Sequence, residues 1–454
     1  MKNIAPKLQA DQYERNFSDL HPPFTQNAAT TEAFRCLYCY DSPCMKACPT
    51  HIDISTFIKK ISSGNLLGSA KTIYQSNWVP LTCAKACPVD VLCEGACVYN
   101  AKGEDPIQIG RLQRFVIENY FEKGMPTLFD KQPNSGKSVG IVGSGPAGLA
   151  CGAELALLGY SVTIYEANKI PGGLNTWGIA PYKMRREDSL KEVELVKSFG
   201  VDIKTEVMIG KTVKVDDLLK QHDAVFLGVG LGESPQLSIK GEELSGVIGA
   251  LDFIEKVKTE NWKDINVGKR VAVIGAGNTS IDAATEAKRL GAEQVYIIYR
   301  RSDVEMSAYE FEYQLAKKDG IIFHFLTAPK QIIGKDSVEG IECVKMKLAE
   351  PDIRGRRKAI PIPGSEFTIH VDMVIKAIGQ ETKSSFLGSI PNVTLDEEGC
   401  VIVDQTSYQT TNPKIFAGGD CINGGKEVVN AAYDGKRAAQ GIHAFLSDQL
   451  KGEK

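Results

Sequence analysis

The chain has 454 residues, which at roughly 150 residues per domain suggests about three domains, each long enough to bury a core. Hydrophobic residues make up 43% and charged residues 24%, values that exclude a fibrous or disordered chain. With 53 basic and 56 acidic side chains the net charge is -3, so no nucleic-acid partner is expected.

The 12 cysteines are unevenly spread, because eight of them fall between residues 36 and 97. Residues 1–20 mix charged with apolar residues and lack the apolar core of a secretory signal, so we expect a reducing, cytoplasmic location. The most apolar stretch, residues 138–162, is interrupted by glycines and carries Glu154, so no membrane span is expected.

Residues 1–130 are expected to form a helical domain. Ile54, Phe57, Ile58 and Ile61 recur at helical spacing, and a similar pattern runs from residue 109 to residue 120. The turn and linker residues between positions 124 and 138 place a boundary near residue 130.

Two similar strand-turn-helix-strand units follow, the first beginning at Ser138 and the second at Arg270. Later apolar segments, 371–379 and 414–420, are interpreted as returns to the first of these domains. We therefore expect an α/β fold with two nested Rossmann-like dinucleotide-binding domains after the helical domain. The expected boundaries are 131–265 and 371–454 for the two parts of the first domain, and 266–370 for the inserted one.

The first unit carries a glycine-rich phosphate-binding pattern. Its glycines would permit a tight turn, close approach to a pyrophosphate and close packing of helix on strand. Glu166, about 20 residues further on, would accept hydrogen bonds from the ribose hydroxyls. The candidate residues of the turn are Gly143, Ser144, Gly145, Pro146, Ala147 and Gly148.

The second unit repeats this pattern with two differences. Ser280 stands where a third glycine would be, and Arg300 and Arg301, not a carboxylate, follow the second strand. Two guanidinium groups could bind a 2′-phosphate, which favours NADPH over NADH, although they could also be a solvated surface pair. The candidate residues of this turn are Gly275, Ala276, Gly277, Asn278 and Thr279.

Gly419 and Asp420 precede a further helix, and at these residues the chain resembles the flavoproteins that have two dinucleotide-binding domains. The resemblance implies FAD on residues 138–166 and NADH or NADPH on residues 270–301. It also implies further cofactor contacts at Gly173, Leu174, Lys183, Gly379, Gly419 and Asp420.

None of the four late cysteines forms the Cys-x-x-Cys dithiol that many such flavoproteins carry beside the flavin. Disulfide reductase chemistry is therefore disfavoured, and electrons leaving FAD need another acceptor. No side chain is an obvious general acid or nucleophile, so we name no catalytic residue.

The early cysteines provide that acceptor. They fall in Cys-x2-Cys, Cys-x3-Cys and Cys-Pro patterns, and thiolates are soft ligands suited to iron–sulfur clusters or zinc. Clusters are preferred because they carry single electrons, whereas zinc sites would give the flavin no electron exit. Free core cysteines are the remaining alternative, since disulfides are not expected in a reducing compartment.

Residues 31–120 resemble the N-terminal part of dihydropyrimidine dehydrogenase, in motifs such as residues 36–49, 83–88 and 106–115. Similar motifs occur in the glutamate synthase small subunit. The resemblance implies one [4Fe-4S] cluster on Cys36, Cys39, Cys44 and Cys97, and a second on Cys48, Cys87, Cys93 and Gln113. Cys83 would be left out.

Gln113 favours the pyrimidine branch, because glutamate-synthase-like relatives tend to have Glu in that position, although Gln113 could also be an exposed helical residue. The resemblance then implies an electron-input subunit. FAD would oxidise NAD(P)H, and the two clusters would pass single electrons to a partner chain whose FMN reduces uracil or thymine to the 5,6-dihydro form. A glutamate synthase small subunit or another NAD(P)H:ferredoxin-type subunit is the alternative, and a non-catalytic iron–sulfur scaffold is a third.

Overall fold

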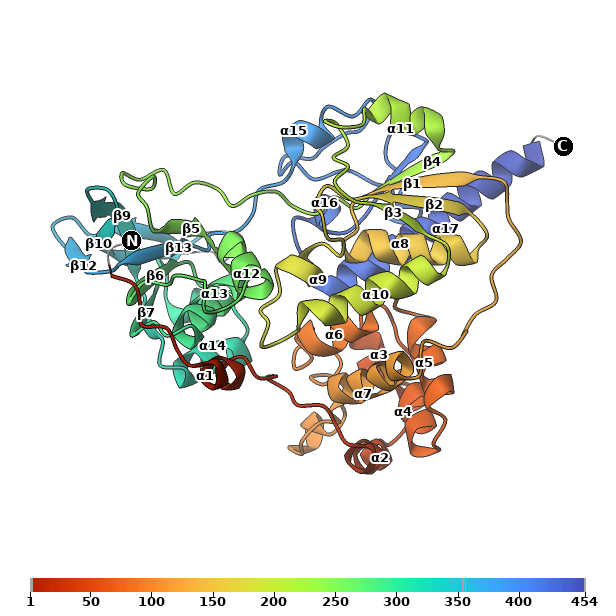
Figure 1. The fold of residues 1–454 in the computed structure, drawn as a ribbon, viewed down its shortest axis with the longest axis horizontal. Helices are drawn as coiled ribbons and strands as arrows, with labels where there is room; N and C mark the ends of the chain where they lie inside the picture. Colours follow the sequence, from red (N-terminus) through yellow and green to blue (C-terminus); the bar gives the residue numbers. More distant parts are fainter. Residues whose placement is uncertain (1–2, 353–354, 356, 453–454) are drawn as a thin grey trace. The chain divides into compact units, whose positions relative to one another are not determined.

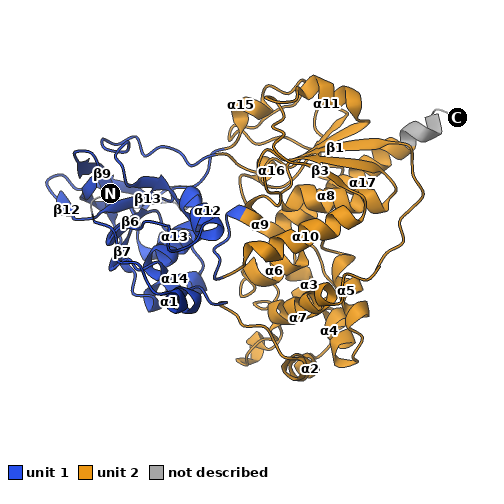
Figure 2. Ribbon diagram, viewed as in Figure 1, with its two compact units in different colours: residues 1–19, 177–182, 233–381 blue, residues 20–176, 183–232, 382–454 orange. Residues whose placement is uncertain are grey.

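The structure is a computed structural model that describes residues 3–352, 355 and 357–452. The chain divides into two compact units, each built from segments that lie far apart in the sequence (Figure 2). The first unit consists of residues 1–19, 177–182 and 233–381. The second consists of residues 20–176, 183–232 and 382–454.

The second unit contains a five-stranded parallel sheet with the strand order β14-β4-β1-β2-β3. Its strands are β1 (Ser138–Val142), β2 (Ser161–Tyr165), β3 (Asp202–Lys204), β4 (Ala224–Leu227) and β14 (Ile415–Ala417). Strand β1 is buried along its last four residues, as expected for a parallel strand that is covered on both faces.

Helices cover both faces of this sheet (Figure 1). On one side lie α8 (Pro146–Leu157), α10 (Arg186–Ser198) and α17 (Val428–Gly452), and on the other lies α11 (Val215–Gln221). Short helices occupy loops: α9 (Leu174–Trp177), α15 (Ser384–Leu387) and α16 (Asp420–Asn423). Helices α8 and α17 approach so closely that a Cβ atom on Gly435 would lie 2.0 Å from the carbonyl oxygen of Ala147.

The cysteine-rich segment of the second unit is helical. Its helices are α2 (Gln26–Arg35), α3 (Pro43–Ala47), α4 (Ile54–Ser62), α5 (Leu66–Tyr74), α6 (Pro80–Ala86), the 3₁₀ turn η1 (Asn100–Lys102) and α7 (Ile109–Glu122). The apolar stripe predicted on α4 is buried. This segment shares one hydrophobic core with α8, and Trp78 Nε1 donates a 2.8 Å hydrogen bond to Glu154 Oε2 on that helix.

The first unit contains a second five-stranded parallel sheet, of order β5-β13-β6-β7-β8, and a smaller antiparallel sheet. The parallel strands are β5 (Val247–Gly249), β6 (Arg270–Ile274), β7 (Gln294–Ile298), β8 (Ile322–His324) and β13 (Met373–Lys376). The antiparallel strands are β9 (Thr327–Gly334), β10 (Val338–Pro351), β11 (Arg357–Pro361) and β12 (Phe367–Ile369).

The helices of the first unit are α1 (Ala10–Asn16), α12 (Ala250–Thr259), α13 (Asn278–Arg289) and α14 (Glu310–Lys318), with the 3₁₀ turn η2 (Asp303–Glu305). The N-terminal residues join this unit because Phe17 stacks on Trp262, with ring centroids 4.5 Å apart. In the part of the chain that the structure describes, no helix combines the length and apolar character that a membrane span requires.

The predicted α/β class with two Rossmann-like sheets is confirmed, and strand β14 returns late in the sequence to the sheet that β1 begins. The expected return of residues 371–379 to the first sheet is wrong, because β13 pairs with β5 and β6 in the second sheet. Only the later segment, with β14, returns, and the inserted part runs from residue 233 to residue 381 and not from 266 to 370. Residues 1–19 lie in the first unit, and the helical cysteine-rich segment and the first sheet lie together in the second.

Candidate cofactor sites and cysteine cavities

The turn after β1 has the geometry that its glycines suggested. Gly143 has φ of 98°, and a Cβ atom there would lie 2.4 Å from the carbonyl oxygen of Gly228. A Cβ atom on Gly148 would lie 2.0 Å from the carbonyl oxygen of Gly143, so the helix can approach the strand only with glycine at this position. Both residues are therefore required by the packing of the chain itself.

Gly145 differs from its two neighbours. It is the N-cap of α8, and a Cβ atom on it would meet nothing nearer than the Cα atom of Gly173, at 4.0 Å. The chain leaves space in front of Gly145, at a helix N-terminus whose free N–H groups favour an anion. This open space fits a pyrophosphate that approaches the backbone closely.

Glu166 is buried directly after β2 and is held by the glycine-rich turn. Its Oε2 accepts hydrogen bonds from Ser144 N at 3.0 Å and Ser144 Oγ at 2.5 Å, and its Oε1 accepts one from Asn168 N at 2.8 Å. The Ser144 hydroxyl accepts a bond from Gly172 N at 2.9 Å. These bonds bring the predicted turn around Gly173 to the same site.

The late segment also reaches this site. A Cβ atom on Gly419 would lie 3.0 Å from the Cβ of Ala147, at the first turn of α8. Asp420 follows and accepts a 3.1 Å bond from Lys426 N, and burial raises the pKa of its carboxyl. Four segments predicted to bind FAD therefore converge on the start of α8. Leu174, at the start of α9, is 40% exposed.

Sequence reasoning missed two polar residues at this site. Asp434 on α17 accepts a 3.1 Å bond from Gly419 N, and Lys383 Nζ donates a 2.6 Å bond to the carbonyl oxygen of Val229. Burial lowers the pKa of Lys383, while the charges of Cys421 and Glu166 oppose that shift. Asp434 lies on the helix expected after Asp420, but its bond to Gly419 depends on tertiary packing, and Lys383 belongs to no motif. The predicted Lys183 is half-buried between α9 and α10.

The second glycine-rich turn lies between β6 and α13. Gly275 has φ of 126°, and a Cβ atom on it would lie 2.1 Å from the carbonyl oxygen of Ala377. Ser280 fits at the third position, and its hydroxyl donates a 3.2 Å bond to that same carbonyl. Gly277 has more room, since a Cβ atom on it would lie 3.3 Å from Ser307 Oγ.

The other residues predicted at this second site surround the same turn. Ala276 O accepts a bond from Ala308 N, and Asn278 Oδ1 accepts one from Tyr309 N, while Thr279 is exposed. Gly379, which has φ of 99°, has nothing within 4 Å of a hypothetical Cβ atom.

The two arginines after β7 have different surroundings. Arg300 is exposed, whereas Arg301 is half-buried. The Nε of Arg301 is buried and has no hydrogen-bond partner among the described residues. An unpartnered buried donor on a cation is costly unless a ligand satisfies it, so this position fits an anionic group.

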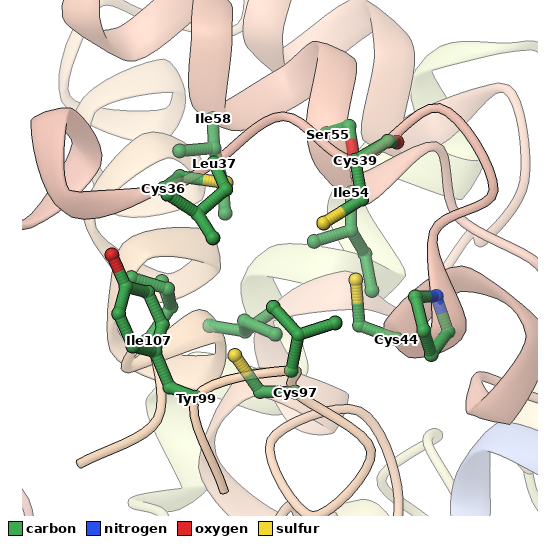
Figure 3. Close-up of a pocket in the computed structure, with 13 residues that line it drawn as sticks. Cys36, Leu37, Cys39, Cys44, Ile54, Ser55, Ile58, Cys97, Tyr99 and Ile107 are labelled. Atoms are coloured by element: carbon green, nitrogen blue, oxygen red, sulfur yellow. The ribbon is translucent and has the colours of Figure 1, made fainter. Parts of the chain in front are cut away.

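Four of the early cysteines line one cavity. Cys36, Cys39, Cys44 and Cys97 surround it, and Figure 3 shows their sulfur atoms turned toward a shared space. The rest of the lining is largely apolar, including Leu37, Ile54, Ile58, Tyr99 and Ile107. Burial raises the pKa of the Cys44 thiol to about 12.

A second cavity is lined by the other four early cysteines and by Gln113. Cys48, Cys87 and Cys93 are three of them, and Cys83 is the fourth. Asn77 Nδ2 donates a 3.1 Å hydrogen bond to Cys83 Sγ. Gln113 is not an exposed helical residue: it is 6% exposed, and its Nε2 donates a 2.7 Å bond to the carbonyl oxygen of Pro80.

Across the described ranges, no three His, Cys, Asp or Glu side chains are close enough to hold a single metal ion. The thiols instead surround cavities that several side chains line. Soft thiol ligands around a shared cavity fit an iron–sulfur cluster.

Two family profiles match the chain. The pyridine nucleotide-disulphide oxidoreductase family matches residues 137–435, and the family of dihydropyrimidine dehydrogenase domain II, 4Fe-4S cluster, matches residues 13–125. Among solved structures, Mycobacterium tuberculosis FprA in complex with NADPH has the same fold, with a TM-score of 0.58 and 20% identity, covering 71% of this chain and 86% of that chain.

Curated relatives match nearly the whole chain. The glutamate synthase [NADPH] small chain of Escherichia coli (strain K12) is 34% identical over 445 residues, which are 95% of this chain and 94% of that protein. The NADP(+)-dependent formate dehydrogenase subunit beta of Moorella thermoacetica is 35% identical over 429 residues, 89% of this chain and 60% of that one. The narrower resemblance to the pyrimidine branch stays a prediction. The chain belongs to the glutamate synthase small chain family, as an oxidoreductase with a 4Fe-4S domain followed by a pyridine nucleotide-disulphide oxidoreductase domain.

Proposed function

We infer that the chain is an electron-input subunit that oxidises NAD(P)H and passes single electrons to a partner chain. One observation carries this proposal. The second unit contains both the glycine-rich turn before α8 and two cavities lined by thiols, and the helices around these sites share one hydrophobic core. Bound FAD would supply the conversion of a two-electron donor into single electrons, and clusters would carry them onward.

The residues of the chain would position these groups. The open space at Gly145 and the N-terminus of α8 would hold the FAD pyrophosphate, Glu166 would accept from the ribose, and Asp420 would bind the ribityl chain. In the first unit the turn at Gly275 would hold NAD(P)H. The buried Nε of Arg301 would donate a hydrogen bond to a phosphate of this nucleotide.

We propose [4Fe-4S] clusters in both cavities, the second held by Cys48, Cys87, Cys93 and Gln113. The bond from Gln113 Nε2 to Pro80 fixes the orientation of the amide and leaves Oε1 as its unused acceptor. A neutral oxygen ligand would change the net charge and hence the potential of that cluster. Cys83 would remain a free thiol beside it.

The proposed partner is an FMN-containing chain that reduces uracil or thymine. Gln113 and the family description of residues 13–125 support this partner. A glutamate-synthase-type partner is the second candidate. It is favoured by the 34% identity with a glutamate synthase small chain, in an alignment that covers 95% of this chain. Co-expression with each candidate partner, followed by assays of uracil-dependent and glutamine-dependent NADPH and NADH oxidation, decides between them. Failure with uracil and success with glutamine would overturn the pyrimidine proposal.

The proposed ligand Gln113 has its own test. Gln113→Ala should perturb the EPR signal of one cluster and lower the iron content, while FAD content is retained because the flavin-type residues are untouched. Gln108→Ala is the matched control, because Gln108 is the N-cap of the same helix, α7, but lies outside the second cavity. Unchanged iron and EPR signals in Gln113→Ala would exclude the ligand.

A further inference from the structure

Helix α6 connects the two kinds of site in the second unit. Cys83 on this helix and Cys87 at its C-cap line the second cavity, and its first turn contains Thr82. Thr82 Oγ1 accepts a 3.3 Å hydrogen bond from Asn175 Nδ2, on the helix that follows the flavin-type turn at Gly173. The first turn of α6 is therefore bonded to one site and leads directly into the other.

A carboxylate from another helix holds this turn. Glu192 on α10 has 0% of its surface exposed. Its Oε1 accepts bonds from Leu81 N at 2.6 Å and Thr82 N at 3.1 Å, and its Oε2 is bonded to the Thr82 hydroxyl. The two backbone bonds satisfy N–H groups at the start of α6 that have no partner inside the helix.

The charge of Glu192 has no direct cationic partner among the described residues. Lys85, the nearest ammonium group on α6, is bound by Asp188 at 2.6 Å and lies 3.6 Å from Glu118. Asp188 lies one turn from Glu192 on α10 and adds a like charge, and the buried phenol of Tyr74 on α5 also faces it. On the α8 side, the carboxylate of Glu154 is bound by Trp78 and Lys436.

Burial raises the pKa of Glu192 to about 8, against the lowering effect of the Thr82 and Leu81 donors. The group is therefore protonated below this pH and ionised above it. Both states fit the same contacts, because the Thr82 hydroxyl can donate to an ionised Oε2 or accept from a protonated one. Proton binding needs no rearrangement of the backbone.

We propose that Glu192 is a positioning residue that holds α6 between the flavin and the second cluster, and that under alkaline conditions, where its carboxyl is ionised, it binds a proton when an electron enters that cluster. The inference rests on the proposed cluster in the second cavity. The electron would come from NAD(P)H through FAD, and one proton would move from solvent to a Glu192 oxygen, so the net charge of this buried region would not change. Adding negative charge nearby favours the protonated carboxyl.

The test is a redox titration of the whole chain, followed by EPR, from about pH 6 to about pH 10. The second cluster is identified as the signal that Cys87→Ala removes. In the wild type its midpoint potential should be constant below the pKa that Glu192 has beside the oxidised cluster. It should fall by 59 mV per pH unit, the one-electron equivalent of a tenfold change, between that pKa and the higher pKa beside the reduced cluster. A potential that stays flat across the range overturns the proposal.

Two variants separate this effect from a general structural one. Glu192→Gln keeps the shape and most hydrogen bonds but cannot titrate, so its potential should match the wild type at low pH and stay flat at high pH. Glu194→Gln is the control, because Glu194 lies on the same helix with its side chain 59% exposed and paired with Lys197. It should keep the wild-type slope, and a slope lost in both variants overturns the proposal.

Failure of the proposed cluster assignment can be distinguished from failure of the proposed role of Glu192. If the reconstituted wild type held only one cluster by iron analysis, the proposed function would fail before any pH titration. If both clusters assemble and the slope survives in Glu192→Gln, only the role of Glu192 is excluded. Thr82→Val keeps the carboxyl of Glu192 but removes its hydroxyl partner. The midpoint potential of this variant should still fall with pH, but over a shifted pH range. This variant keeps the proposal testable if Glu192→Gln folds poorly.

Discussion

The two glycine-rich turns share a backbone conformation, and they differ at the third position of the glycine pattern and after the strand that follows. In both, the first glycine has a positive φ and lies against a carbonyl oxygen of a neighbouring strand end, that of Gly228 for Gly143 and that of Ala377 for Gly275. The third position is Gly148 in one turn and Ser280 in the other. The strand that follows ends at buried Glu166 in one and at Arg300 and Arg301 in the other.

The difference shows which part of such a turn is structural and which part selects the ligand. Glycine is needed at the first position of both turns, because the conformation has a positive φ and a carbonyl oxygen of the chain lies where a Cβ atom would be. The third residue depends on how closely the helix approaches the strand, so Ser280 is allowed where Gly148 is not. The residue after the second strand is the one predicted to contact the ligand, and we expect the carboxylate and the guanidinium pair to favour different nucleotides.

The largest expected effect comes from Gly148→Ala. Its Cβ atom would lie 2.0 Å from a backbone oxygen, so α8 must move away from β1, at a cost of about 3 kcal/mol in the free energy of unfolding. Denaturant unfolding and flavin absorbance measure the loss. Gly152→Ala on the same helix is the control, since its Cβ atom would meet only the ends of movable side chains, the nearest being that of Ile164 at 3.2 Å. Equal losses in the two variants would contradict this account.

Gly145→Ala should separate folding from binding. Its Cβ atom would meet no protein atom closer than 4.0 Å, so the stability of the apoprotein should be unchanged. The same Cβ atom would enter the space assigned to the pyrophosphate and weaken FAD binding by about 2 kcal/mol, roughly 30-fold. Titration of the apoprotein with FAD measures this, and an unchanged dissociation constant would exclude the assigned position.

Replacing Arg300 and Arg301 with Gln should act on one nucleotide only. Loss of charge-assisted bonds to a 2′-phosphate costs about 2 kcal/mol, so the KM for NADPH should rise roughly 30-fold while that for NADH changes little. The single variants sharpen this result, because half-buried Arg301 should account for more of the effect than exposed Arg300. Equal changes for both nucleotides would show that neither arginine binds the 2′-phosphate.

The smallest effect is expected from Ser280→Ala. It removes the 3.2 Å bond to Ala377 O but leaves the helix where it is, so the unfolding free energy should fall by about 1 kcal/mol. Denaturant unfolding measures this, with NADPH kinetics as a check on the turn. A loss as large as that of Gly148→Ala would mean that the two third positions are equally crowded.

Much of the architecture follows from local patterns in the sequence. The two Gly-x-Gly turns predict their strands and helices because a positive φ and a close carbonyl leave few alternatives to glycine. The apolar spacing on α4 predicts its buried face for a similar local reason. No local pattern assigns the N-terminal residues to the first unit, because the stacking of Phe17 on Trp262 depends on a residue far along the chain.

The sequence by itself determined two Rossmann-like sheets, a cysteine-rich segment with helical spacing and the two glycine-rich turns. Only the tertiary structure decided that Cys83 lines the same cavity as Cys48, Cys87 and Cys93, and that Glu192 bonds to the first turn of α6. Spacing along the chain governs local conformation, whereas these groupings depend on how helices pack. For that reason the buried carboxylate of Glu192 belongs to no motif.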